Sequence, residues 1–180
     1  MDDALIAALR SGDRDAFAAL VERETGPIYR TCARILGAGA DAEDVAQETF
    51  VIAYRSLRGF RGTGSLRGWL LRIASRQAFR RLHRRRPAAP LDAVAEERVA
   101  DANADPARVS VLRERHGSIR STVASLPDPY REVVALRFFA ELSLLEIAEA
   151  TGRPLNTVKT HLRRGLERLR PLLGDEESPS

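Results

Sequence analysis

Helical periodicity of the apolar residues is the feature that most narrows the possible folds of this 180-residue chain. Apolar side chains that recur three or four positions apart share one face of an α-helix and give it an inner side. The segment 15–37 has this spacing at Phe17, Leu20, Val21, Ile28, Cys32, Ile35 and Leu36, and it ends at Gly37 and Gly39. Alternating patterns are short and β-branched residues are scattered, so no strand is expected. The sequence therefore predicts an all-α fold.

The end of the chain has the pattern of a helix-turn-helix. Ser143 and Glu146 form an S-x-x-E capping box, which predicts a short helix over 144–151. Gly152 follows as the turn, and a last helix is expected to start near Asn156 or Thr157. Its apolar stripe is Val158, Leu162, Leu166, Leu169 and Leu173, and its outer face carries Thr157, Lys159, Thr160, His161, Arg163, Arg164 and Arg168. A helix with such a face fits the major groove of DNA.

Positive charge is concentrated in one part of the chain. The net charge is +4, yet residues 1–50 hold ten acids and five arginines, whereas residues 51–90 hold eleven arginines and no acid. Such asymmetry indicates an anionic partner at one surface. Within it, Phe60–Arg86 contains nine arginines, two phenylalanines and Trp69. Because rings stack on unpaired bases while arginines hold phosphates, this stretch favours contact with single-stranded nucleic acid.

Two further helix starts and a linker complete the predicted organisation. Asp41 and Asp128 are expected N-caps, the second followed by Pro129 in the first turn. The inner face of the helix after Asp41 comprises Val45, Thr49, Ile52 and Ala53, and that of the helix near Trp69 comprises Leu66, Trp69, Leu70 and Ile73. From Pro87 the chain is rich in alanine, proline and aspartate. We therefore expect two small helical domains, 1–86 and 116–174, a flexible linker over 87–115, and a disordered tail over 175–180; the helix-turn-helix lies in the second domain, whose helices begin near Ala107.

Several classes of function are excluded by the same sequence. It has no glycine-rich phosphate loop, no G-x-S-x-G and no H-E-x-x-H, and its three histidines lack metal-ligand spacing, so we expect no enzyme, metal or cofactor. Cys32 is the only cysteine, which rules out an internal disulfide and favours a buried thiol. Apolar runs are too short for a membrane span, and the acidic N-terminus is unlike a secretory signal. A cytoplasmic location is expected.

The order of these parts resembles a known family. "DAEDVAQETFVIAYRSL", "FRGTGSLRGWLLRIA" and "LPDPYREVVALRFFAELSLLEIAEATGRPLNTVKTHLRRGLERLR" are similar, in that order, to the polymerase-docking helix, the promoter-melting segment and the C-terminal domain of bacterial sigma factors. The group they resemble is the small extracytoplasmic-function (ECF) subfamily of the sigma-70 family. This resemblance covers roughly residues 10–86 and 116–173 and implies a factor that directs promoter-specific transcription initiation.

The resemblance also assigns site residues and partners. It implies core RNA polymerase, promoter DNA and an anti-sigma factor as partners, with no membrane insertion. The expected polymerase-binding residues are Asp44, Gln47, Glu48 and Val51. Those expected at the −10 promoter element are Phe60, Arg61, Thr63, Ser65, Trp69, Arg72, Arg76 and Arg80. Those expected at the −35 element are Asn156, Thr157, Lys159, Thr160, His161, Arg163 and Arg164.

Two other readings remain open at the level of sequence. The segment "LSLLEIAEATGRPLNTVKTHL" is also close to the DNA-binding unit of LuxR-type regulators, which would bind duplex operators as dimers. Receiver domains of such regulators alternate strands and helices, and the N-terminal half here predicts no strands. An adaptor that uses the arginine-rich helix on structured RNA is the second alternative. A preference for RNA over forked DNA would distinguish it.

Overall fold

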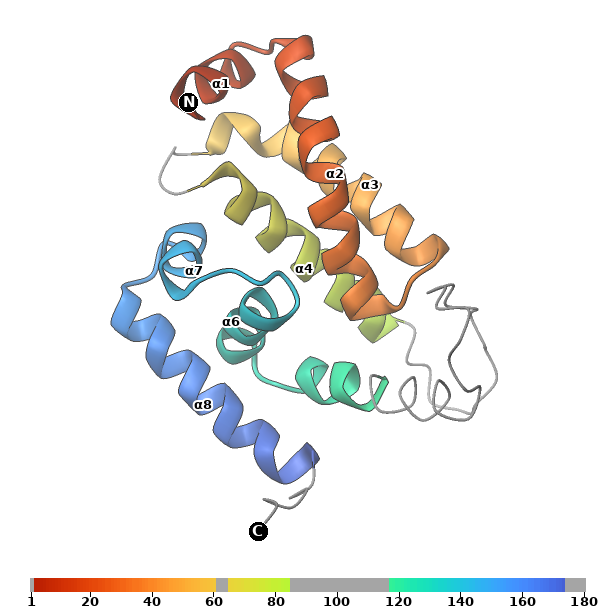
Figure 1. Ribbon diagram of the computed structural model, residues 1–180, viewed down its shortest axis with the longest axis vertical. Helices are drawn as coiled ribbons and strands as arrows, with labels where there is room; N and C mark the ends of the chain where they lie inside the picture. Colours follow the sequence, from red (N-terminus) through yellow and green to blue (C-terminus); the bar gives the residue numbers. More distant parts are fainter. Residues whose placement is uncertain (1, 61–64, 85–116, 174–180) are drawn as a thin grey trace, which may run out of the picture.

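The computed structural model describes residues 2–60, 65–84 and 117–173, and all regular structure in these ranges is helical (Figure 1). This confirms the predicted all-α class. Residues 117–124 are helical, and the other elements are α1 (Asp2–Arg10), α2 (Arg14–Leu36), α3 (Ala40–Ser56), the 3₁₀ turn η1 (Leu57–Gly59), α4 (Leu66–Arg84), α6 (Asp128–Phe138), α7 (Leu144–Thr151) and α8 (Leu155–Leu173). None of the helices in the described ranges is both long enough and apolar enough to cross a membrane.

The N-terminal helices α2, α3 and α4 pack on one another through the apolar faces that the sequence predicts. Asp13 caps α2, accepting hydrogen bonds from the backbone N–H groups of Asp15 at 2.9 Å and Ala16 at 3.1 Å. The core between these helices includes Leu20, Ile28, Ile35, Val45, Ala53 and Leu70, all fully or almost fully buried. Cys32 lies in the same core, and burial raises the pKa of its thiol to about 12.

Helix α4 occupies the middle of the molecule. Figure 1 shows it between α2 and α3 on one side and the C-terminal helices α6 and α7 on the other. Its buried residues Leu66, Leu70, Ala74 and Ala78 belong to a single apolar cluster that extends into α6 through Val133 and Leu136. The helix that carries Trp69, Arg72, Arg76 and Arg80, half of the predicted −10 residues, is therefore packed on two sides.

The helix-turn-helix is formed by α7 and α8. Ser143 caps α7 by accepting from the Glu146 N–H at 3.2 Å, and the Glu146 carboxylate accepts from the Ser143 N–H at 2.8 Å. Gly152 ends α7 with φ 67°, a left-handed conformation that favours glycine. The predicted capping box and turn are thus confirmed.

Helix α8 begins at Leu155, in agreement with the expected start near Asn156 or Thr157, but its predicted apolar stripe is only partly buried. Val158 and Leu169 are buried as expected, but Leu166 is 41% exposed and Leu173 is 43% exposed. The buried residues of α8 are Val158, Gly165 and Leu169, and Gly165 packs against α6, so Leu166 lies at the edge of the covered face.

Neither predicted aspartate N-cap is found. Helix α3 starts after Gly39 without a side-chain cap, and Asp41 instead forms an ion pair with Arg81 of α4 at 2.7 Å. Helix α6 starts after Pro127, so Asp128 is already helical and pairs with Arg131. In both cases an arginine binds the carboxylate that a cap would have needed. The predicted linker and tail, and the helix start near Ala107, lie outside the described residues.

Candidate nucleic-acid interface

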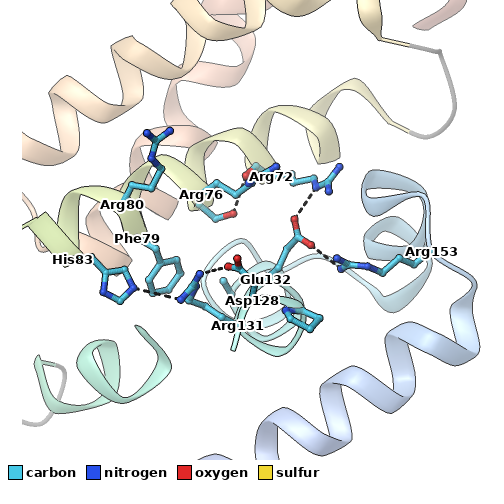
Figure 2. Close-up of a pocket in the computed structure, with 12 residues that line it drawn as sticks. Arg72, Arg76, Phe79, Arg80, His83, Asp128, Arg131, Glu132 and Arg153 are labelled. Atoms are coloured by element: carbon cyan, nitrogen blue, oxygen red, sulfur yellow. Dashed lines mark hydrogen bonds and ion pairs between the residues drawn. The ribbon is translucent and has the colours of Figure 1, made fainter. Parts of the chain in front are cut away.

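Three of the predicted −10 arginines share one face of α4. Arg72, Arg76 and Arg80 are spaced four residues apart, which places them one above another on a helix. They line a cavity of about 330 Å³ between α4 and α6 (Figure 2). Five arginines and two carboxylates contribute to its walls, so the cavity is cationic overall. Arg76 and Arg80 are exposed and form no ion pair within the described residues.

Glu132 of α6 is the acidic centre of this cavity. Figure 2 shows it between Arg72 and Arg153: its Oε1 accepts from Arg72 Nε at 2.8 Å, and its Oε2 lies 2.7 Å from Arg153 Nη1. Its side chain is only 12% exposed. Burial works to raise the pKa of Glu132, but hydrogen bonds and charge from Arg72 and then Arg153 hold it below the ordinary value of 4.5. The carboxylate is therefore ionised at neutral pH.

The aromatic residues beside α4 form a structural pair. Phe60 is 6% exposed, and its ring lies 5.1 Å from that of the half-buried Trp69. Arg10 donates to the Phe60 carbonyl, which ties α1 to the segment before α4. Ser65 accepts from the Gly68 N–H at 3.0 Å and so caps the first turn of α4. Arg61 and Thr63 lie outside the described residues.

A buried glutamate fixes the start of α4. Glu24 of α2 is 1% exposed and accepts from Arg67 Nε and Arg23 Nε, each at 2.8 Å. A carboxylate this deep needs both partners, because an unpaired buried charge is costly. Sequence reasoning missed Glu24 and Glu132. The sequence signal that could have identified them is an acidic residue among apolar residues on the inner face of a helix.

The outer face of α8 presents most of the predicted −35 residues to solvent. Asn156, Lys159, Arg163 and Arg164 are exposed, while Thr157 and Thr160 are half-buried. The Thr160 hydroxyl donates to the Asn156 carbonyl at 2.9 Å. Arg163 pairs with Glu167 at 2.9 Å, whereas Lys159 and Arg164 form no ion pair in the described part of the chain. These two are the cations of this face that are most available to an external anion.

His161 is oriented differently from its neighbours. Its ring packs edge-on against Tyr130 of α6 with centroids 5.6 Å apart, and Arg168 lies over the same Tyr130 ring at 4.9 Å. Burial lowers the pKa of His161 below its ordinary value of 6.5, and the nearby charges of Arg153 and Arg164 lower it further. The imidazole is therefore neutral at pH 7 and contributes to the α6–α8 contact.

The four predicted polymerase-binding residues form one exposed face of α3. Asp44, Gln47, Glu48 and Val51 follow helical spacing, and Val51 is 49% exposed. The opposite face, with Val45, Thr49 and Ala53, is buried. Tyr54, which the sequence analysis did not select, is 50% exposed and continues the same face, with its ring 4.9 Å from Phe17. A surface of this kind, acidic at one end and apolar at the other, suits a protein partner.

A helix-turn-helix and a second, arginine-rich helix are features of DNA-binding proteins. Comparison with known proteins narrows this class. Residues 20–87 match the family model for Sigma-70 region 2, and residues 116–169 match that for Sigma-70, region 4. The first matched segment contains α3 and α4, and the second contains α6, α7 and most of α8.

Full-length relatives show the same relationship. The ECF RNA polymerase sigma factor SigW of Bacillus subtilis (strain 168) is 37% identical over 179 residues, covering 94% of this chain and 95% of that protein. The ECF RNA polymerase sigma-E factor of Escherichia coli (strain K12) is 33% identical over 174 residues, covering 92% and 91%. The solved structure of CnrH in complex with the cytosolic domain of CnrY has a TM-score of 0.62 and 28% identity, covering 97% of each chain. The chain belongs to the ECF sigma factors.

It is therefore a factor that binds core RNA polymerase and directs promoter-specific transcription initiation. The LuxR-type alternative is not supported, because the region 2 match and the relatives extend through the N-terminal half. The helical N-terminal half also lacks strands within its described residues, which a receiver domain would have.

Proposed function

We propose that the three surfaces described above divide the work of a sigma factor among α3, α4 and α8. In this proposal, residues 1–86 dock on the polymerase and engage the −10 element, residues 116–174 read the −35 element, and 87–115 connect them. The observation that carries the proposal is the exposed face of α3. Within the described chain, no other helix covers Asp44, Gln47, Glu48 or Val51. The chain would act by binding alone, without an enzymatic step.

The −10 element would be held by α4 and the segment before it. Arg72, Arg76 and Arg80 would contact the backbone phosphates, which supply affinity without sequence information. The Phe60–Trp69 ring pair and the Ser65 cap flank, in sequence, the expected loop that contains Arg61 and Thr63. Separated bases would then be captured by that loop, and Phe60, Ser65 and Trp69 would position it.

The −35 element would be read in the major groove by α8. Asn156, Thr157 and Thr160 can hydrogen-bond base edges, while Lys159, Arg163 and Arg164 can reach guanine or phosphate. His161 would set the angle of α8 through its contact with Tyr130. An anti-sigma factor is proposed as a regulatory partner, as the resemblance to the ECF sigma factors implies; the similar protein CnrH was solved in complex with the cytosolic domain of CnrY.

Binding of the full chain to purified core RNA polymerase tests the proposal. Charge reversal in Asp44→Arg/Glu48→Arg should weaken binding about a hundredfold, since close charge pairs across an interface can be worth about 1.5–7 kcal/mol each. Glu22→Arg is the matched control, because Glu22 is also an exposed acid on a helix, outside the α3 face. Equal affinity of the double variant and the control would reject α3 as the docking surface. Loss of binding in both the double variant and the Glu22→Arg control would also reject α3 as the docking surface.

A further inference from the structure

Glu24 of α2 is the only charged residue that is buried in the described part of the chain, with 1% of its surface exposed. Its two carboxylate oxygens have different partners. Oε2 accepts from Arg67 Nε at 2.8 Å, and Oε1 accepts from Arg23 Nε at 2.8 Å. Arg67 Nη2 donates a longer hydrogen bond to Oε1, at 3.5 Å. The carboxylate is therefore held by one guanidinium group of its own helix and one of α4.

Stability alone does not account for a carboxylate at this position. Desolvation of two charges offsets most of their attraction, and well-packed apolar residues in place of a buried ion pair are often equally or more stabilising. Leu20 and Ile28, one turn away on either side of Glu24, are both buried, so the site is suited to an apolar residue. An apolar contact has no direction, however, whereas hydrogen bonds between a carboxylate and a guanidinium group fix an angle.

The group that Glu24 orients lies in the first turn of α4. Arg67 is the second residue of this helix, after Leu66. Ser65 accepts from the Gly68 N–H at 3.0 Å, which fixes where the helix starts, and Leu66 is 1% exposed, which fixes the face that turns inward. Neither contact fixes how far α4 is shifted along α2. The Glu24–Arg67 pair supplies this constraint, because it joins the two helices through directional bonds.

A separate set of contacts anchors the chain before α4. Arg10 of α1 donates to the Phe60 carbonyl, and the Phe60 ring lies 5.1 Å from that of Trp69. Only four residues, 61–64, join this anchor to the start of α4. We call residues 60–65 the −10 segment. Since so short a chain has a limited reach, the positions open to it depend on where the first turn of α4 lies.

We propose that Glu24 is a positioning residue for base selection at the −10 element, which acts by holding Arg67 and, through it, the first turn of α4. Recognition sites tolerate displacements of only about 0.5 Å, so a small shift of this turn is enough to weaken selection. Overall affinity does not depend on Glu24, because the phosphate contacts are assigned to Arg72, Arg76 and Arg80. This inference rests on the proposed function, in which the −10 segment captures separated bases.

Selection from a DNA pool by the polymerase-bound chain measures base selection directly. The probe is forked DNA whose single-stranded arm contains a short randomised stretch. The full chain and each variant are assembled with core RNA polymerase, and the bound DNA is sequenced. The fraction of the pool that is retained reports overall affinity. The enrichment of the best-bound sequences over the starting pool reports discrimination between bases.

Glu24→Leu removes the ion pair and keeps the site filled. We expect enrichment to fall about tenfold, the usual size of one lost base contact, while the retained fraction stays the same. The urea midpoint of unfolding should stay the same or rise, because an apolar residue replaces a buried charge. Glu22→Leu is the matched control, since it makes the same change at an exposed position of the same helix, and its enrichment should equal that of the natural chain.

Arg67→Leu breaks the same pair from the other side. Enrichment should fall as in Glu24→Leu, but here the urea midpoint should fall too, because Glu24 keeps its charge in the core with Arg23 as its remaining arginine partner. Loss of selection in both variants, with opposite effects on stability, is the result that supports positioning. If Glu24→Leu selects sequences as well as the natural chain, the positioning role is rejected whatever its urea midpoint.

Glu24→Gln decides the case in which Glu24→Leu fails to fold. Its neutral amide binds Arg67 more weakly than a carboxylate does, so enrichment should be lower than in the natural chain. Enrichment equal to that of the natural chain would then reject the proposal, and so would failure of both variants to fold. If the natural chain itself enriches no sequence from the pool, capture of separated bases is rejected, which is a failure of the proposed function rather than of Glu24.

Discussion

At the scale of single residues, Gly165 determines how closely α8 approaches α6. A Cβ atom at this position would lie 2.8 Å from Val134 Cγ2 and 3.5 Å from the Tyr130 Cβ. Val134 is 2% exposed and β-branched, so its side chain cannot turn aside without a new clash. The packing of α6 on α8 therefore requires a residue without a side chain at position 165.

We predict that Gly165→Ala destabilises the chain despite the better helix propensity of alanine. Overpacking costs about 1–3 kcal/mol and the propensity gain returns at most about 1, so the free energy of unfolding should fall by about 1–2 kcal/mol. Gly117→Ala is the control, since a Cβ there meets nothing within 4 Å. Urea unfolding followed by circular dichroism measures both. A Gly165→Ala protein as stable as the control would show that α6 and α8 can separate without cost.

At the scale of helices, the capping box of α7 is the best-defined local signal in the chain. Hydrogen bonds from Ser143 hold the pKa of Glu146 below its ordinary value of 4.5, which reflects the reciprocal bonding of the two residues. Because α7 has only eight residues, its start depends strongly on this cap. The orientation of the helix-turn-helix depends on it in turn.

Ser143→Ala should lower the free energy of unfolding by about 1 kcal/mol, the usual cost of losing a serine N-cap. Ser125→Ala should have a much smaller effect, because the exposed Ser125 hydroxyl only donates to the Thr122 carbonyl and caps no helix start. Thermal unfolding of the two variants under the same conditions makes the comparison. Equal losses would mean that tertiary contacts, rather than the cap, hold the start of α7.

Helix α8 allows a prediction about salt dependence. Arg164→Ala should weaken binding to −35 duplexes of any sequence and reduce the slope of log affinity against log salt by about 1, as expected for the loss of one phosphate contact. Arg163→Ala should change the slope less, because Glu167 already neutralises Arg163 in the free chain. Arg170→Ala, at the other end of α8, is the control. Binding isotherms at several salt concentrations would contradict the assignment if all three slopes were equal.

Sequence reasoning succeeded where the structure is local and failed where distant residues decide it. The capping box at Ser143 and the turn at Gly152 depend on a few neighbouring residues, and both were predicted. Asp41 and Asp128 look like caps in sequence, but Arg81 and Arg131 bind their carboxylates in the folded chain. No local pattern indicates the Asp41–Arg81 pair, whose residues lie 40 positions apart, whereas Asp128–Arg131 is an i,i+3 pair within α6 that sequence spacing could have indicated.

At the scale of the whole molecule, the packing of α4 against α6 could not be predicted from sequence. Arg72 and Glu132 are 60 positions apart, and neither residue type alone specifies a partner. The sequence predicts the arginine-rich face of α4 to be an anion-binding surface, but it does not indicate that an acid from the C-terminal half of the chain, Glu132, meets this face. Such pairings depend on how the N-terminal helices α2 to α4 pack against the C-terminal helices α6 and α7. Composition and periodicity do not encode this packing.

The Arg72–Glu132–Arg153 cluster should make the stability of the fold depend on pH. Because the pKa of Glu132 is lowered on folding, its contribution is fully present above the ordinary value of 4.5 and is lost as the pH falls through the lowered value. The difference in unfolding free energy between the natural chain and Glu132→Gln should therefore be largest near neutral pH and shrink in acid. Urea titrations of both proteins across this range measure it. A difference that stays constant with pH would show that ionised Glu132 does not stabilise the fold.

Cys32 has a consequence for how the chain meets an oxidising environment. Oxidants such as peroxide attack the thiolate, and this thiol is both fully buried and held protonated by its surroundings. With no second cysteine, the chain cannot form an internal disulfide in response. The folded chain therefore does not react with thiol oxidants. An oxidative signal can act on it only through another molecule that carries a reactive thiol.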